Sequence, residues 1–170
     1  SRIICVSSCA AEKMSMTQDD YAKINMSDIY REKAAWNDVL QYGASKLANY
    51  LHAKEFAKRE PGVTTVALHP GWALTPLMKE MPFVARTCVM PLFGKSFGVI
   101  SVQEASQVHL YCCLAPVKDL QSGAFYSQKG IYTDPVMAKG ALPLIEFNNP
   151  NINDDLEKTL FQWSLKEVGL

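Results

Sequence analysis

The sequence predicts an α/β fold in which helices cover a sheet of parallel strands. Three short apolar segments alternate with three segments of helical periodicity, in the order strand, helix, strand, helix, strand, helix. Such alternation is typical of parallel strands joined by right-handed helical crossovers. The composition agrees, because 48% of the 170 residues are hydrophobic and 20% are charged, which suits a globular core. We therefore expect residues 1–170 to form a single domain, or part of one.

The N-terminal half of this alternation contains two strands and one helix. Residues 2–7, Arg-Ile-Ile-Cys-Val-Ser, form a continuous apolar run, as expected of a strand that is buried on both faces. Residues 9–38 are polar and mixed, and we expect a long loop there. Residues 41–59 place apolar side chains at helical spacing and cations near the C-terminal end, which favours a helix. Residues 63–68 are β-branched and predict the second strand.

The C-terminal half contains the remaining strand and two helices. Residues 103–114 predict a helix, and residues 123–127 predict the third strand. Asn153 can cap the last helix, because its side-chain oxygen can accept a hydrogen bond from a backbone N–H of the first turn. Acidic residues follow Asn153 where the helix dipole favours them, and apolar residues recur along one face. These apolar residues are Leu156, Leu160 and Trp163.

Charge and hydropathy exclude several classes of function. Seventeen basic residues balance seventeen acidic ones and form no basic stripe, so we expect no nucleic-acid partner. The most apolar long stretch, residues 83–100, is interrupted by Arg86 and Lys95, which disfavours a membrane span. The histidines and cysteines lack the spacing of metal ligands, so we expect no metal site.

Tyr42 and Lys46 place a phenol and an ammonium group one turn apart on the same face of the first predicted helix. The reference pKa of a tyrosine is about 10, and a nearby cation lowers it by favouring the phenolate. Tyr42 could then exchange a proton with a substrate oxygen. A plain helix-surface contact is the alternative interpretation, since Tyr50 and Lys54 repeat the spacing. Eight residues rotate an α-helix by about 80°, so the second pair should point elsewhere.

Two further groups of residues follow the ends of predicted strands. Ser7 and Ser8 follow the first strand, and His69-Pro70-Gly71 follows the second, with Thr75 beyond it. Ligands of an open α/β sheet bind at the carboxyl ends of its strands. A hydroxyl there can hydrogen-bond a substrate carbonyl, and a glycine lets the backbone approach a ligand closely. The alternative for both groups is a turn in which polar side chains satisfy backbone groups.

The order of these features resembles the short-chain dehydrogenase/reductase family, in the branch that contains retinol dehydrogenase-like and WW-domain-containing oxidoreductase-like proteins. The matching segments are 2–8 (Arg-Ile-Ile-Cys-Val-Ser-Ser), 42–49 (Tyr-Gly-Ala-Ser-Lys-Leu-Ala-Asn) and 63–71 (Val-Thr-Thr-Val-Ala-Leu-His-Pro-Gly). The resemblance implies that residues 1–170 are the C-terminal portion of a catalytic domain. Its fold would be part of a Rossmann-type doubly wound parallel sheet that lacks the first βαβ units.

The resemblance also implies a role for each matching residue. Ser8 would orient and polarise the substrate oxygen, Tyr42 would be the general acid/base, and Lys46 would lower the pKa of Tyr42 and hold the nicotinamide ribose. Residues 77–100 fall where the family carries its substrate lid, and their apolar side chains suit a hydrophobic substrate, with core or partner surface as the alternative. The residues that would bind NAD or NADP are Tyr42, Lys46, Pro70, Gly71 and Thr75.

The function implied is that of an NAD(P)-dependent oxidoreductase, which interconverts a hydrophobic alcohol and its aldehyde or ketone, such as a retinoid or steroid. The chain begins at Ser1 within a predicted strand, so we expect a fragment. The family's glycine-rich pyrophosphate turn and catalytic Asn would lie upstream, so we expect the fragment to be inactive alone and to bind dinucleotide poorly. A non-catalytic truncated dehydrogenase-fold binding module is the alternative.

Location and assembly are less constrained by the sequence. Five cysteines without a C-x-x-C pair favour a reducing compartment, and we expect a cytoplasmic protein. Because related proteins often carry an anchor in the portion missing here, the cytosol-facing membrane of the endoplasmic reticulum is the alternative. A homo-oligomer is compatible with the sequence.

Overall fold

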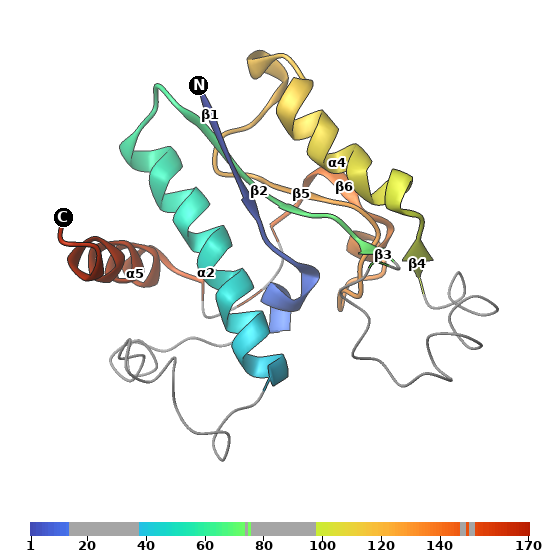
Figure 1. Cartoon of the computed structure of the whole chain (residues 1–170), viewed down its shortest axis with the longest axis horizontal. Coiled ribbons are helices and arrows are strands. Elements are labelled where there is room, and N and C mark those ends of the chain that lie inside the picture. The colour runs from blue at the N-terminus through green and yellow to red at the C-terminus, as the bar shows by residue number, and fades with distance from the viewer. Residues whose placement is uncertain (14–37, 74, 76–97, 147–148, 150–151) are drawn as a thin grey trace.

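A computed structural model describes residues 1–13, 38–73, 75, 98–146, 149 and 152–170 of the chain. Its main sheet has the strand order β1-β2-β5-β6 (Figure 1). The bounds are β1 (Arg2–Val6), β2 (Thr64–His69), β5 (Phe125–Ser127) and β6 (Ala141–Leu144). β1 and β5 both run parallel to β2, with Val6 opposite Leu68 and Tyr126 opposite Leu68 on the other side. The predicted α/β fold is therefore confirmed.

β6 makes the sheet mixed, whereas the sequence predicted parallel strands throughout. β6 runs antiparallel to β5, with Leu144 opposite Phe125. The connection between them, residues 128–140, contains only the short turn η8 (Met137–Lys139) and no crossover helix, so the chain returns beside β5 in the opposite direction. Pro143 has no backbone N–H to donate, and an edge strand tolerates that loss.

The expectation that the first strand is buried on both faces is wrong for the described chain. Ile3 and Val6 of β1 are 37% and 40% exposed. Within the described residues β1 pairs with β2 alone and lies at the edge of the sheet, so its second side has no neighbouring strand. β2, which lies between β1 and β5, is buried from Thr65 to His69.

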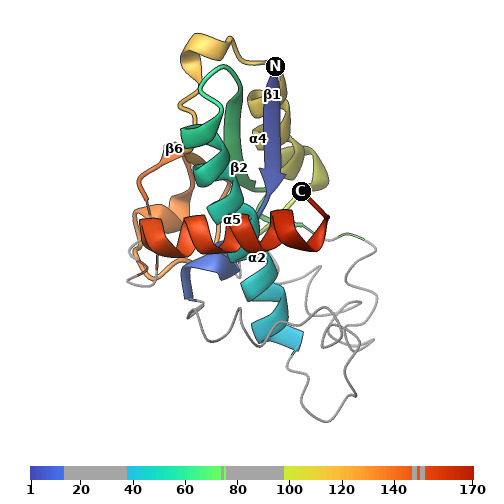
Figure 2. The same ribbon diagram turned by 90° about the vertical axis from the view of Figure 1, so that its left-hand side faces the viewer.

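Helices cover both faces of the sheet. α2 (Asp38–Arg59) lies on one face and α4 (Val102–Leu114) on the other (Figure 1). α5 (Asp154–Glu167) crosses α2, as Figure 2 shows. α2 and α4 end at the predicted residues and begin slightly before the predicted ones. Asn153 caps α5 as expected, because its side chain accepts a hydrogen bond of 2.9 Å from the Leu156 N–H. Ser101 and Glu104 form a capping box at the start of α4 that sequence reasoning missed.

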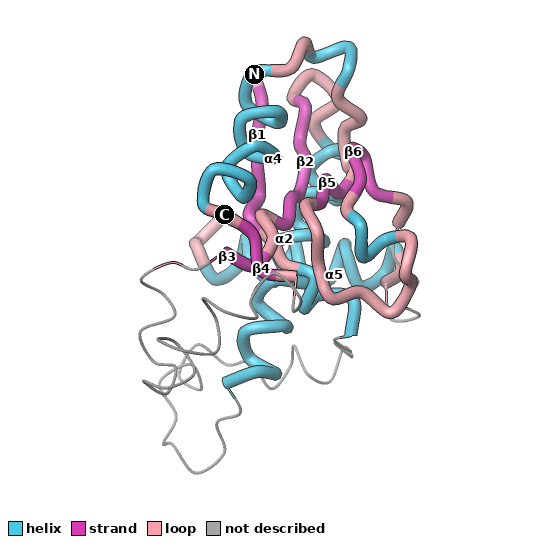
Figure 3. The backbone as a smooth tube through the Cα atoms, turned by 90° about the vertical axis from the view of Figure 1, so that its right-hand side faces the viewer, coloured by secondary structure: helices cyan, strands magenta, loops and turns pink. Residues whose placement is uncertain are grey.

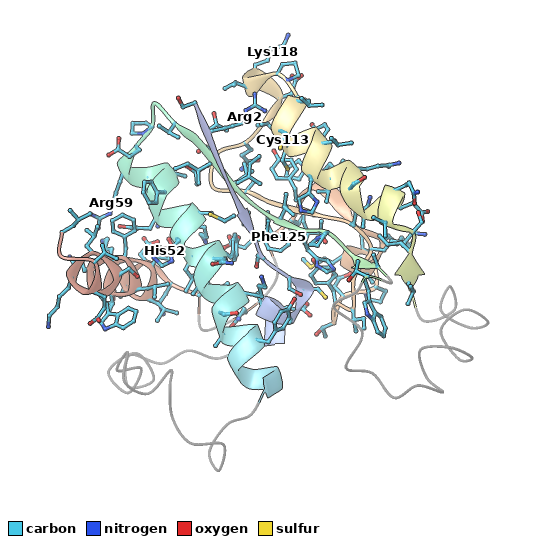
Figure 4. All side chains as sticks on the ribbon, in the orientation of Figure 1. Arg2, His52, Arg59, Cys113, Lys118 and Phe125 are labelled. Atoms are coloured by element: carbon cyan, nitrogen blue, oxygen red, sulfur yellow. The ribbon has the colours of Figure 1, made fainter. Side chains whose placement is uncertain are left out.

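Two hydrophobic clusters form the core, one on each face of the sheet. The cluster under α2 joins Leu47 and Leu51 to Ala67, Phe125 and the apolar face of α5. The cluster under α4 joins Val108 and Cys112 to alternate residues of the same strands. Phe125 lies near the centre of the molecule in Figure 4, and its ring packs edge-on against Tyr50 at 5.1 Å between centroids. These contacts fix α2 against the sheet.

A second, two-stranded ladder lies beyond the carboxyl ends of β1 and β2 (Figure 3). It pairs β3 (Trp72–Ala73) with β4 (Val99–Ile100) in parallel. Short 3-10 turns complete the fold at η1 (Cys9–Lys13) and η7 (Val117–Asp119). The predicted loop and lid lie mainly outside the described residues. In the described part of the chain, no helix has both the length and the apolar character needed to cross a membrane.

Candidate active site

Three side-chain hydrogen bonds join the end of β1 to Lys46 and Asn49 of α2. The Ser7 hydroxyl donates to the Lys46 carbonyl at 2.6 Å. In the other direction, the Lys46 ammonium and the Asn49 amide both donate to the Val6 carbonyl, at 3.3 Å and 2.9 Å. These bonds bring the Ser7-Ser8 segment and the Tyr42–Lys46 turn to one place, at the carboxyl end of the sheet where the sequence predicted a site.

Tyr42 and Lys46 form an open pair. The Lys46 Nζ lies 5.5 Å from the centroid of the Tyr42 ring, which is within range of a cation–π contact. Tyr42 is 47% exposed, and its hydroxyl has no hydrogen-bond partner among the described residues. Lys46 forms no ion pair with a carboxylate of the described chain. Both polar groups are therefore accessible to a ligand.

The two serines differ in what their hydroxyl groups do. Ser7 is buried, and its proton is used in the bond to the Lys46 carbonyl, so Ser7 is a structural residue. Ser8 is also buried, but its oxygen accepts a hydrogen bond from the Ala10 N–H at 3.2 Å. No described residue accepts the Ser8 proton, so this hydroxyl can still donate to a ligand oxygen.

Gly71 has a packing reason for being a glycine, where the sequence suggested ligand approach. Its φ is +88°, a backbone conformation that other residues rarely adopt. An added Cβ would lie 2.5 Å from the Ile100 Cδ1 and 3.1 Å from the Gln128 Cβ. Gly71 thus lets the end of β2 pass close to β4 and the segment after β5. Pro70 and Thr75, which were also predicted to bind the cofactor, are both half-buried.

His69 lies at the end of β2 and is not suited to act as a base. It is 5% exposed, and neither ring nitrogen has a well-formed hydrogen bond to a described residue. Burial lowers the pKa of His69 to about 4, against an opposing contribution from the Lys129 backbone. The ring packs edge-on against Tyr132. The neutral His69 is therefore a buried packing residue at the end of β2.

The second Tyr-x-x-x-Lys pair of α2 is closed by acidic partners. Tyr50 is 2% exposed and donates to Glu146 at 3.3 Å. Burial, reinforced by the charge of Glu146, its hydrogen bond and the charge of Glu157, raises the pKa of Tyr50 above its ordinary range. Lys54 pairs with Glu146 and also with Glu157, at 3.1 Å. Burial opposes the charge on Lys54, but the bonds to both carboxylates outweigh burial and raise its pKa.

Sequence reasoning missed Asn49, although the matching segment 42–49 ends on it. The signal that could have found it is spacing, since Asn49 lies three residues after Lys46 and thus on the same side of the helix. The structure adds the shared acceptor, the Val6 carbonyl.

Tyr42 and Lys46 are the polar groups of this site that could hold part of a cofactor. Lys46 offers an ammonium group without a carboxylate partner in the described chain, and Tyr42 lies exposed beside it. The nine glycines form no glycine-rich phosphate turn. Within the described residues, no group of three or more His, Cys, Asp or Glu side chains could hold a metal ion.

Known proteins resemble this chain in sequence and in fold. No family model matches the chain. Retinol dehydrogenase 12 of Mus musculus is 34% identical over 108 residues, which cover 62% of this chain and 32% of that protein. Retinol dehydrogenase 11 of Homo sapiens is 33% identical over 129 residues, covering 75% and 36%. The chain thus spans about a third of the length of the curated relatives that it matches.

A solved structure supports the fold independently. The crystal structure of an uncharacterised protein from Mycobacterium Paratuberculosis superposes with a TM-score of 0.56 at 22% identity, covering 97% of this chain and 49% of that one. At this level of identity the likeness concerns the fold alone.

Proposed function

We propose that this chain, a partial-length homologue of retinol dehydrogenases in the short-chain dehydrogenase/reductase family, carries the proton-transfer half of an NAD(P)-dependent oxidoreductase site. The substrate would be a hydrophobic alcohol and its aldehyde or ketone. The observation that carries the proposal is the open Tyr42–Lys46 pair, tied to the end of β1 directly before Ser8.

The chain's residues would move one proton in each turnover. In carbonyl reduction, the Tyr42 hydroxyl donates its proton to the carbonyl oxygen, and in alcohol oxidation the Tyr42 oxygen takes the hydroxyl proton. The Ser8 hydroxyl donates a hydrogen bond to the same oxygen and steadies the charge that develops on it. The Lys46 ammonium stabilises negative charge on the Tyr42 oxygen. The chemistry that a bound nicotinamide would supply is transfer of a hydride to or from the substrate carbon.

The cofactor would be held at its nicotinamide end only. Lys46 would donate to the ribose hydroxyls, while Pro70, Gly71 and Thr75 would lie along the nicotinamide. Because the chain supplies no phosphate cradle, we expect weak dinucleotide binding by residues 1–170 alone. A tight complex in a calorimetric titration of this chain would contradict that expectation.

The substrate class follows from similarity and composition. Two matched relatives are retinol dehydrogenases by name, and residues 77–100 are rich in methionine and phenylalanine, which suits a flexible apolar ligand. We propose a retinoid or steroid-like substrate and a cytoplasmic site of action, with the cytosolic face of the endoplasmic reticulum as the alternative.

The test compares the two tyrosines of α2 in a longer protein that contains this chain and a glycine-rich cofactor turn. We expect Tyr42→Phe to lower the turnover of retinol or retinal with NAD or NADP by about 10²–10⁴-fold, as for loss of a general acid/base. Tyr50→Phe is the matched control and should keep most of the turnover. Equal turnover in wild type and Tyr42→Phe would refute the proposal.

A second candidate function rests on the exposed edge of β1. Ile3 and Val6 of β1 expose apolar side chains, and β1 pairs on one side only within the described sheet. Such edge strands associate with other strands. The chain would then be a non-catalytic binding module. Self-association of residues 1–170 in analytical ultracentrifugation, relieved by Val6→Lys, would favour this candidate.

A further inference from the structure

The Val6 carbonyl accepts hydrogen bonds from two side chains of α2. Ser7 donates its backbone N–H to Leu68 of β2 at 2.7 Å, and successive residues of a strand alternate in direction, so the Val6 carbonyl faces away from β2. Asn49 and Lys46 occupy it at 2.9 Å and 3.3 Å. The Asn49 bond is the shorter of the two, and the Lys46 bond lies near the outer limit for an N–H···O contact.

This arrangement leaves one donor in excess. A backbone carbonyl needs at least one partner, and Asn49 supplies it alone. Lys46 can then turn toward a ligand without leaving the carbonyl unpaired. Without Asn49, departure of Lys46 would strip the carbonyl of its side-chain donors from the described chain, so the ammonium would be held back on the strand.

We infer that Asn49 is a positioning residue that releases the Lys46 ammonium by holding the Val6 carbonyl in its place. This inference rests on the proposed function, in which the released ammonium serves Tyr42 and a ribose hydroxyl. Asn49 itself touches neither the substrate nor the cofactor in this scheme. A purely structural role, in which Asn49 merely ties α2 to β1, makes the opposite prediction for the freedom of Lys46.

The first test measures the freedom of Lys46 directly and needs no activity. The 170-residue chain is treated briefly with acetic anhydride, and acetylation of Lys46 is quantified by mass spectrometry against exposed Lys118 in the same sample. We expect Asn49→Ala to slow the acetylation of Lys46 several-fold, since the ammonium then serves as the side-chain donor to Val6. Unchanged or faster acetylation would overturn the inference, because a loosened helix exposes its lysines.

Two further variants keep this test sharp. Ser45→Ala removes an exposed hydroxyl near Lys46, whose one hydrogen bond to a described residue goes to the Tyr42 carbonyl, and should leave the Lys46 rate unchanged. Asn49→Ser keeps a polar side chain but lacks the reach to Val6, and should slow acetylation as Asn49→Ala does. If Asn49→Ala fails to fold by circular dichroism, Asn49→Ser gives the answer.

The second test uses the longer protein. We expect Asn49→Ala to raise the KM for the nicotinamide cofactor about tenfold, and to have no further effect in a Lys46→Gln background, because both changes remove the same contact. Additive effects would overturn the inference. Slowed acetylation in a longer protein that turns over no substrate would instead refute the proposed function while the release of Lys46 stands.

Discussion

The first and second halves of α2 carry the same Tyr-x-x-x-Lys spacing in opposite environments. At the N-terminal end, Tyr42 is 47% exposed and Lys46 bonds to a backbone carbonyl. Two turns later Tyr50 is 2% exposed, and Lys54 pairs with Glu146 and Glu157. The lysine geometry is almost equal, at 5.5 Å and 5.6 Å from the respective ring centroid. Partners from outside the helix, rather than spacing within it, therefore separate an available pair from a structural one.

The largest expected effect on stability comes from the closed pair. Lys54→Met should lower the free energy of unfolding by about 2 kcal/mol, because Glu157 is 1% exposed and would lose one of the two cations that neutralise it. Lys46→Met, the matched change at the open pair, should stay within about 0.5 kcal/mol. Urea unfolding of both variants measures the difference, and equal losses would break the comparison.

The pH dependence of stability tests whether His69, at the end of β2, is buried and neutral. Its folded pKa of about 4 lies below the ordinary value of 6.5, so the unfolded chain binds the proton first as the pH falls. The contribution of the neutral His69 ring to the free energy of unfolding is fully present above about pH 6.5 and is lost as the pH falls toward 4. Between about pH 7.5 and 5, wild type should lose about 2 kcal/mol more than His69→Phe. Parallel pH profiles in chemical unfolding would contradict the buried, neutral state of His69.

Ser7 sharpens the distinction between a structural and an available hydroxyl. Ser7→Ala removes the buried bond to the Lys46 carbonyl, and should cost about 1 kcal/mol of unfolding free energy. Ser45→Ala removes an exposed bond of similar length and should cost clearly less. Thermal unfolding of the two variants measures the difference. An equal shift in Tm would argue against a stabilising hydrogen bond between Ser7 and the Lys46 carbonyl.

The smallest effect concerns the alkaline limit of stability. Because the pKa of Tyr50 is raised in the folded state, the unfolded chain loses that proton first above about pH 10, and stability falls as the pH rises further. Tyr50→Phe should reduce this alkaline loss slightly, since the phenol no longer ionises on unfolding. Absorbance titration near 295 nm should also lack one late-titrating tyrosine in this variant. Identical alkaline profiles would show that Tyr50 ionises normally.

The sequence predicted the elements well where local pattern decides them. Apolar periodicity predicted α2 and α4, and Asn153 indicated the start of α5. β6 escaped prediction because Ala-Leu-Pro-Leu contains a proline and depends on the neighbouring strand β5 for its conformation. The exposure of β1 also depends on which strands lie beside it, and residues 2–7 alone carry no such information.

The candidate site divides in the same way. The positions of Ser8, Tyr42 and Lys46 at strand and helix ends follow from the order of elements, and their catalytic roles stay predictions. The closure of Tyr50 depends on Glu146 and Glu157, which are about a hundred residues away in the chain, so no local spacing could distinguish it from Tyr42. Asn49 likewise acquires meaning only through the Val6 carbonyl.

α5 crosses α2 and so supports the helix that bears the candidate site. His52 forms a hydrogen bond with Ser164, and the Arg59 guanidinium stacks on Phe161. The C-terminal half of α2, where Figure 4 labels His52 and Arg59, therefore packs against α5. Loss of α5 would remove Ser164 from His52, Phe161 from Arg59 and Glu157 from Lys54. Truncation before Asn153 should therefore destabilise α2, the helix that bears the candidate site.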